Sequence, residues 1–277
     1  SDLDIQIPID NNATTATNWI PAIRLGDGAK LKLILEGKNT LKGGDMCAAI
    51  DVPEGCTLTI RGEGSLKATG GVGAGIGASS MRKGSLGTIE INGGNIEAYG
   101  SGMAAGIGGS REGGIGTIVI NGGTVYAKGG HGSYSGDIKN VYGGAGIGGG
   151  AYGCVDKIEI NGGNVTAYGG YTANASHPGA AIGTGGGGAK PVEDGYKYGE
   201  IVIKGGTVSA IAYNNEVYAI GIGVKPGQAL QEGTLVGSIS ISDQAVVNLN
   251  GGDYFPKSEN SGLKNYTIQG TIADVRF

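Results

Sequence analysis

The chain has 277 residues and few of the residue types that usually mark a functional site: three cysteines, two histidines, one tryptophan and two phenylalanines. Cys47, Cys56 and Cys154 lack the CxxC spacing of a zinc site, and their odd number leaves at least one thiol unpaired. We expect three unpaired, partly buried thiols that act as small hydrophobic side chains.

Charged residues are also sparse, and neither sign is concentrated. The net charge is −4, and the longest basic run is Arg82-Lys83, which gives no electrostatic basis for nucleic-acid binding. No apolar run approaches the ~18 residues that a membrane-spanning helix needs, so no membrane insertion is expected.

Glycine, by contrast, is abundant, with 61 residues. Glycine and proline at this level without a period would indicate a disordered chain. Here the glycines recur in step with alternating Ile and Val, most clearly in GTIEINGGNIEAYG (Gly87–Gly100) and GTIVINGGTVYAKG (Gly116–Gly129). Such a repeat over most of the chain indicates one elongated unit built from stacked copies.

Each copy contains three short apolar segments, which predict three short strands with one buried face. The first is an Ile-x-Ile segment, the second carries Val-x-Ala, and the third is a small-residue segment of the Ala-Gly-Ile-Gly type. The first strand aligns at Leu33/Leu35, Leu58/Ile60, Ile89/Ile91, Ile118/Ile120, Ile158/Ile160, Ile201/Ile203 and Ile239/Ile241. The isoleucines of the third align at Ile23, Ile50, Ile76, Ile107, Ile147, Ile182 and Ile222.

A single copy cannot bury its apolar face, whereas parallel stacking of like strands can. The crossover rule makes such coiling right-handed. The sequence therefore predicts an all-β fold, a right-handed parallel β-helix of about seven three-stranded coils with end caps. We expect one domain over 1–277, with an N-terminal cap at 1–20 that includes Trp19, coils at 21–250 and a C-terminal cap at 251–277.

The corners between the first and second strands carry Gly pairs, which supply positive φ. Asn92, Asn121 and Asn161 precede three of these pairs, and their side chains are placed to bond to one another along the stack. A seven-bladed propeller is the alternative fold, but its blades need four strands and the shortest copies have room for three.

Two motifs together resemble a known family: Gly-Ala-Gly-Ile-Gly at Gly73–Gly77 and Gly144–Gly148, and Thr-Ile-x-Ile-x-Gly-Gly followed by Val-x-Ala-x-Gly. They resemble the glycine-rich repeats of large adhesin-like surface proteins of gut and other anaerobic bacteria, whose coils are similar to pectate-lyase-like β-helices. The resemblance covers about residues 20–250. It implies a secreted, cell-surface location, attachment as part of a larger surface protein, and an adhesin-like or carbohydrate-associated role.

Two long loops in the middle of the chain, 129–143 and 169–178, are the first candidate site. Their candidate ligand-binding residues are His131, Tyr134, Asp137, Tyr142, Tyr171 and His177. Tyrosine offers a flat ring and a hydroxyl to a sugar, and a histidine near an aspartate can transfer protons. The loops therefore suggest a ligand groove or, alternatively, a catalytic one.

The outer wall of the second sheet is the other candidate site. Two rows should project from it: Lys67, Glu97, Tyr126, Thr166 and Ser209, and then Thr69, Tyr99, Lys128, Tyr168 and Ile211. Tyr99, Tyr126 and Tyr168 would form an exposed aromatic strip suited to a polysaccharide chain. The alternative is that tyrosine simply favours half-exposed strands.

The acidic residues are scattered along the repeat. No three fall in register for Ca²⁺, and no carboxylate pair of the glycosidase kind is obvious, so we predict no metal, no cofactor and no catalytic residue. The favoured function is a non-catalytic surface protein that binds polysaccharide or host glycan or serves as a stalk. The alternative is a polysaccharide lyase or glycoside hydrolase with its site at the 129–143 and 169–178 loops.

Overall fold

The computed structural model describes residues 3–6, 19–80, 86–113, 116–132, 142–153, 156–171, 177–187, 199–213, 217–223, 238–250, 265–268 and 271–274, with only the backbone at 3–6, 265–268 and 271–274. Regular structure in these ranges consists of strands. They contain no helix of the length and apolar character that would cross a bilayer.

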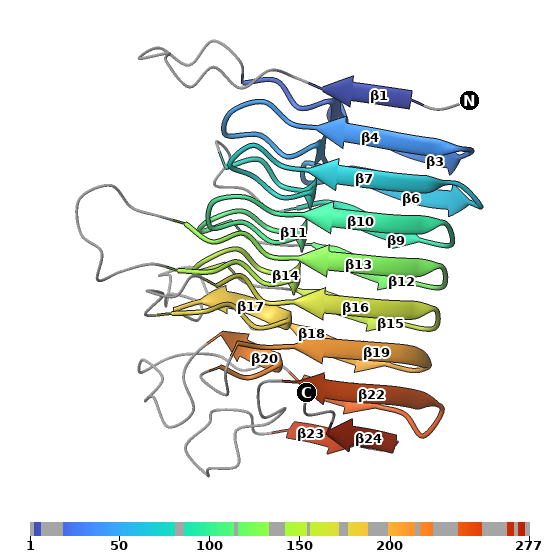
Figure 1. Ribbon diagram of the computed structural model, residues 1–277, viewed down its shortest axis with the longest axis vertical. Helices are drawn as coiled ribbons and strands as arrows, with labels where there is room; N and C mark the ends of the chain where they lie inside the picture. Colours follow the sequence, from blue (N-terminus) through green and yellow to red (C-terminus); the bar gives the residue numbers. More distant parts are fainter. Residues whose placement is uncertain are drawn as a thin grey trace.

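Three parallel sheets, here named A, B and C, form the walls of a column (Figure 1). Sheet A consists of β1 (Leu3–Gln6), β4 (Lys38–Lys42), β7 (Ser65–Thr69), β10 (Asn95–Tyr99), β13 (Thr124–Lys128), β16 (Asn164–Tyr168), β19 (Gly206–Ile211), β22 (Ala245–Asn250) and β24 (Thr271–Asp274). Sheet B consists of β2 (Ile23–Arg24), β5 (Ile50–Asp51), β8 (Ile76–Gly77), β11 (Ile107–Gly108), β14 (Ile147–Gly148), β17 (Ile182–Gly186) and β20 (Ile220–Gly223). Sheet C consists of β3 (Lys30–Leu35), β6 (Thr57–Gly62), β9 (Thr88–Ile91), β12 (Thr117–Ile120), β15 (Lys157–Ile160), β18 (Glu200–Ile203), β21 (Ser238–Ile241) and β23 (Asn265–Ile268).

The chain passes from sheet B to sheet C to sheet A and then steps down one level, so that β2 to β22 make seven coils of three strands. The winding is right-handed (Figure 1). Like strands of successive repeats pair with each other in parallel, as the sequence predicts, and this arrangement is incompatible with a propeller.

Beyond the seven coils, β1 extends sheet A at the start of the column, and β23 and β24 extend sheets C and A at its end. Trp19, placed by the sequence in the N-terminal cap, is 44% exposed. The other residues of the predicted caps lie largely outside the described ranges.

The register stacks like residues on like. Ile118 pairs with Ile89 on one side and Ile158 on the other. The alanines of the Val-x-Ala segments form an inward column, which consists of Ala68, Ala98, Ala127, Ala167 and Ala210. The central prediction, that the Ile91, Ile120 and Ile160 strands lie side by side and parallel, is confirmed.

Two copies were aligned wrongly from the sequence, each by two residues. In coil 1 it is Leu31 and Leu33 that pair with Leu58 and Ile60, whereas Leu35 pairs with Gly62 at the corner. In coil 7, Ile220 rather than Ile222 pairs with Ile182. Both segments alternate apolar residues with period two, so a shift of two keeps the same face inward and the pattern cannot reveal it.

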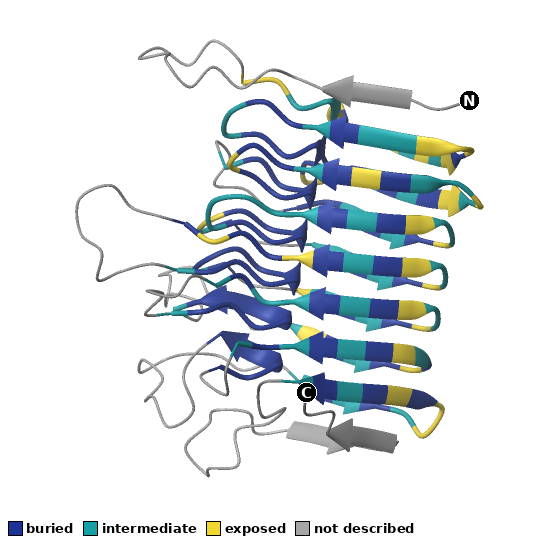
Figure 2. Ribbon diagram, in the orientation of Figure 1, coloured by how far each residue is buried: buried dark blue, intermediate teal, exposed yellow. Residues whose placement is uncertain are grey.

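The column is filled by one aliphatic core (Figure 2). From the second coil to the seventh, strands of sheets A and C alternate buried residues with half-buried or exposed ones, whereas β5, β8, β11 and β14 are buried at both positions. Cys47 and Cys56 are buried free thiols, as predicted, and Cys154 lies outside the described ranges.

A column of glycines explains the small-residue segment of sheet B. Its members have φ between 118° and 141°, and they are Gly77, Gly108, Gly148, Gly183 and Gly221. A Cβ added to Gly108 would lie 2.0 Å from the carbonyl oxygen of Gly148 in the next coil. Glycine is therefore required at these positions for two reasons: the backbone has a positive φ, and the neighbouring coils approach closely.

Replacing Gly108 with alanine should lower the stability strongly, by about 3 kcal/mol, because the new Cβ meets rigid backbone at a positive φ. The measurement is the denaturant midpoint of unfolding. Gly26→Ala is the matched control, since a Cβ at Gly26 meets no atom within 4 Å. Equal midpoints for the two variants would contradict the packing argument.

The corners between sheets C and A carry the predicted asparagine ladder. The Nδ2 group of Asn121 donates to Oδ1 of Asn92 at 2.6 Å, and that of Asn161 donates to Oδ1 of Asn121 at 2.8 Å. Each of these two bonds thus joins a coil to the one before it.

Candidate functional site

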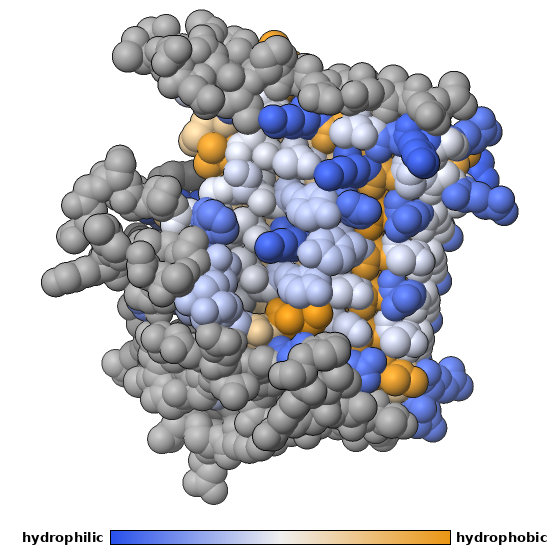
Figure 3. Space-filling model, in the orientation of Figure 1, coloured by the Kyte–Doolittle hydropathy of each residue, from blue (hydrophilic) through white to orange (hydrophobic). Residues whose placement is uncertain are grey.

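The outer face of sheet A presents the two rows predicted from the repeat. Because side chains alternate along a strand, every second residue of β7, β10, β13, β16 and β19 points outward. One row is Lys67, Glu97, Tyr126, Thr166 and Ser209, and the other is Thr69, Tyr99, Lys128, Tyr168 and Ile211. Figure 3 looks onto this face, where weakly polar side chains in the middle are interspersed with strongly polar ones.

Tyr99, Tyr126 and Tyr168 lie on three successive coils and touch one another; we call them the tyrosine strip. The ring centroids of Tyr99 and Tyr126 are 5.6 Å apart with a 44° tilt, and those of Tyr126 and Tyr168 are 5.2 Å apart with a 41° tilt. All three rings are half-buried. The strip is therefore a packed aromatic surface with its outer side open to solvent.

Charged neighbours fix one end of the tyrosine strip. The hydroxyl of Tyr99 donates a hydrogen bond to Oε2 of Glu97 at 3.0 Å, and the Nζ atom of Lys67 lies 5.4 Å from the Tyr99 ring centroid. Burial, the bond to Glu97 and the charge of Glu97 raise the pKa of Tyr99 to about 12. Tyr99 thus stays a neutral phenol at physiological pH, with its ring orientation set by two side chains.

The two long loops come together at their bases. His131 forms an antiparallel bridge with Gly143, and Tyr142 forms a parallel bridge with His177. The rings of Tyr142 and His177 stack, with centroids 4.6 Å apart and planes at 22°. The structure thus brings His177 and Tyr142 together, while His131 is exposed.

Tyr152 joins this cluster and was missed in the sequence. Its ring centroid lies 4.5 Å from that of Tyr142, and Gly187 packs against both rings. Burial and hydrogen bonding with Tyr142 raise the pKa of Tyr152. Tyr152 lies in a loop that follows sheet B, and the repeat has no fixed residue there that would have pointed to a partner for Tyr142.

The remaining loop candidates do not complete a groove within the described part of the chain. Tyr171 stacks on Tyr213 with planes at 13°. Tyr134 and Asp137 lie outside the described ranges, so their predicted role stays a prediction.

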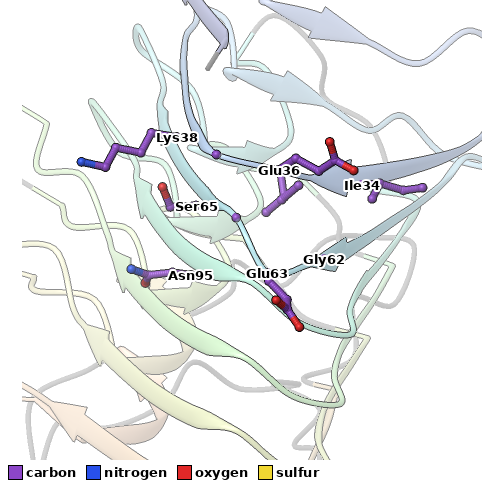
Figure 4. A pocket seen from close by; sticks show the side chains of 10 residues that line it. Ile34, Glu36, Lys38, Gly62, Glu63, Ser65 and Asn95 are labelled. Carbon is purple, nitrogen blue, oxygen red and sulfur yellow. The ribbon is translucent and has the colours of Figure 1, made fainter. Parts of the chain in front are cut away.

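A shallow hollow of about 670 Å³ lies at the corner between sheets C and A in the first coils (Figure 4). Its corners are one residue longer than the later Asn-Gly-Gly corners, with Glu36 and Glu63 at their tips. In Figure 4, Lys38, Ser65 and Asn95 lie on one side of the hollow and the two glutamates on the other. The polar side chains therefore do not converge on a common point.

Sheet C carries an ion-paired outer face instead of an aromatic one. Glu159 accepts hydrogen bonds from Lys157, at 2.8 Å, and from Lys204, and Lys157 also lies 3.6 Å from Glu200. The bonds from Lys157 and Lys204 lower the pKa of Glu159 to about 2. A carboxylate held in this way is ionised at neutral pH and is unsuited to act as a general acid.

Replacing Glu159 with glutamine should destabilise the protein at pH 7 by about 1 kcal/mol, because two partly exposed lysines lose their carboxylate. The folded pKa of Glu159 is lowered from 4.5, so its stabilisation is complete above about pH 5 and is lost as the pH falls through about 2. The unfolding midpoints of wild type and variant should therefore converge between pH 5 and pH 2. A gap that is independent of pH would contradict this assignment.

Asp51 is a buried acid on sheet B, in the column that glycine occupies in later coils. Its Oδ1 atom accepts a bond from the Ser79 amide at 3.1 Å, and its Oδ2 atom lies 3.9 Å from Nε of Arg24. Burial raises the pKa of Asp51. With only 3% of its surface exposed, this carboxyl is out of reach of a polymer substrate. Within the described ranges, no three His, Cys, Asp or Glu side chains are grouped to hold a metal ion.

A family model described as a beta helix repeat matches three stretches, residues 58–80, 89–111 and 158–186. Each stretch begins in a strand of sheet C, passes through sheet A and ends at the next strand of sheet B, which is one turn of the column. Neither a curated protein nor a solved structure matches the chain significantly. The matches thus support the parallel β-helix and carry no information about activity.

Proposed function

We propose that this parallel β-helix is a non-catalytic, adhesin-like surface protein that binds a glycan on the outer face of sheet A. The observation that carries the proposal is the tyrosine strip, three touching rings on three successive coils with one side open to solvent. Aromatic faces pack against the apolar faces of sugar rings, and the hydroxyls bond to sugar hydroxyls.

The wall beneath the strip supports this role. The strands β10, β13 and β16 pair in register with their neighbours over their full length, and the alanines below the strip are fully buried. The rings are therefore held on a rigid surface that loses little conformational freedom when a ligand binds. A repeating surface also suits a repeating ligand, since successive coils present similar groups at the strand spacing.

The proposal extends to location and context. A secreted protein held at the cell surface as part of a larger chain is what the glycine-rich repeats imply by resemblance. A regular column is well suited to hold a binding face away from its attachment point, because each coil contacts only its neighbours. The partner we propose is a polysaccharide or host glycan.

Replacing Tyr126 with alanine should weaken glycan binding about tenfold or more, because Tyr126 contacts both other rings and truncation of a central aromatic anchor commonly costs more than about 1 kcal/mol. The measurement is a glycan array followed by titration of the bound glycans. Tyr126→Phe is the control, since it keeps the ring and should retain most of the affinity. A Tyr126→Ala variant that binds as wild type would refute the role of the strip.

The Tyr142, Tyr152 and His177 cluster keeps the enzymatic alternative open, namely a polysaccharide lyase or glycoside hydrolase at the long loops. If the proposal is right, wild type releases no product from pectic or mucin glycans over long incubation. Product release by wild type that is lost in His177→Ala, and retained in Tyr126→Ala, would instead place catalysis at this cluster. Reducing-end and unsaturated-product assays distinguish the two enzyme classes.

A further inference from the structure

The outer face of sheet A carries an excess of positive charge, although the whole chain is negative. The outward residues of β4 to β22 include four lysines and one acid: Lys38, Lys42, Lys67, Lys128 and Glu97. The net charge of the chain is −4. The excess on this face is therefore a local feature and not a consequence of composition.

Three of these lysines form no ion pair with an acidic side chain that the structure describes. Among the residues whose side chains the structure describes, no carboxylate forms an ion pair with Lys42, Lys67 or Lys128, and Glu97 is engaged by the Tyr99 hydroxyl. On sheet C, by contrast, Lys157 and Lys204 are neutralised by Glu159 and Glu200. Lys30 and Lys32 in the first coil of sheet C likewise form no ion pair with a described side chain. The fold thus neutralises the lysines of sheet C in the later coils, and it leaves lysines without an ion pair beside the tyrosine strip on sheet A.

The unpaired lysines lie beside and within the tyrosine strip. Lys128 occupies the register position between Tyr99 and Tyr168, in the same outward row. Lys67 lies over the Tyr99 ring, and Lys42 continues the row of Tyr99 two coils earlier, opposite Thr69. Ammonium groups therefore follow the column axis next to the rings, over β4, β7 and β13.

We infer that the ligand of this face is an anionic polysaccharide, one whose sugar residues carry carboxylate or sulfate groups. The inference rests on the proposed glycan-binding function and names its substrate class. Rings that contact sugar faces and lysines that contact acidic substituents at the coil spacing match a charged polymer of repeating sugars. Charge complementarity of this kind favours acidic over neutral partners and speeds their association.

The test compares binding of the full chain to immobilised polygalacturonate and chondroitin sulfate with binding to their neutral counterparts, carboxyl-reduced polygalacturonate and desulfated, carboxyl-reduced chondroitin. Poly-glutamate serves as an anionic polymer without sugar rings. The test variant is the triple Lys42→Gln, Lys67→Gln, Lys128→Gln. The matched control is Lys30→Gln with Lys32→Gln, which removes exposed charge from sheet C.

Wild type should bind at least one anionic polysaccharide about tenfold more tightly than its neutral form and than poly-glutamate. The triple variant should lose about tenfold in affinity for that polysaccharide, and the sheet C control should change by less than about twofold. Raising the salt concentration should weaken wild type more than the triple variant.

Several outcomes would overturn the inference. The inference is refuted if neutral polysaccharides bind as tightly as anionic ones, or if the triple variant binds with the affinity of wild type. In either case the proposed function stands as long as Tyr126→Ala still loses binding. Equal binding of poly-glutamate, or an equal loss in the sheet C control, would show a general polyanion effect. Binding to no glycan of either kind, here and on the array, would reject the proposed function as well.

Discussion

Close stacking of identical coils is the constraint on which the rest of this structure depends. Each strand of a coil pairs in parallel with the same strand of the next, so any residue in the repeat must accept its own kind as a neighbour at the strand spacing. Aliphatic side chains meet this condition inside the column. In sheet B the backbones of the third to seventh coils approach so closely that only glycine at positive φ fits, since a Cβ at Gly108 would meet the carbonyl oxygen of Gly148.

The same constraint leaves the outward positions free to differ between walls. The core fixes the path of the backbone, and the outer side chains are then displayed on a scaffold whose spacing does not change from coil to coil. Sheet C uses this freedom for ion pairs around Glu159, and the pair with Lys204 joins neighbouring coils. Sheet A uses it for touching tyrosines and for lysines that form no ion pair with a described side chain. These outward side chains remain available to a partner.

Much of the candidate site on sheet A could be predicted from the sequence because it lies on the repeat. Once Ile118 aligns with Ile89, the row that holds Glu97, Tyr126 and Thr166 follows from alternation alone. The loop site could be predicted only in part. The stacking of Tyr142 on His177 agrees with the expected meeting of the two loops, whereas Tyr152 enters from a loop whose residues differ between copies. Alternation also left two registers ambiguous, at Leu31 and at Ile220, where period two gives the same face for either choice.

The sequence by itself determined the three-stranded coil, the inward columns and the asparagine ladder, because a repeat with fixed spacing and fixed glycines leaves one way to bury its apolar face. Only the tertiary structure decided which lysines form an ion pair with a described acidic side chain, how the tyrosine rings tilt against one another, and which loop residues meet. Those features depend on distances between side chains on different coils, and such distances are set by packing, which local periodicity does not encode.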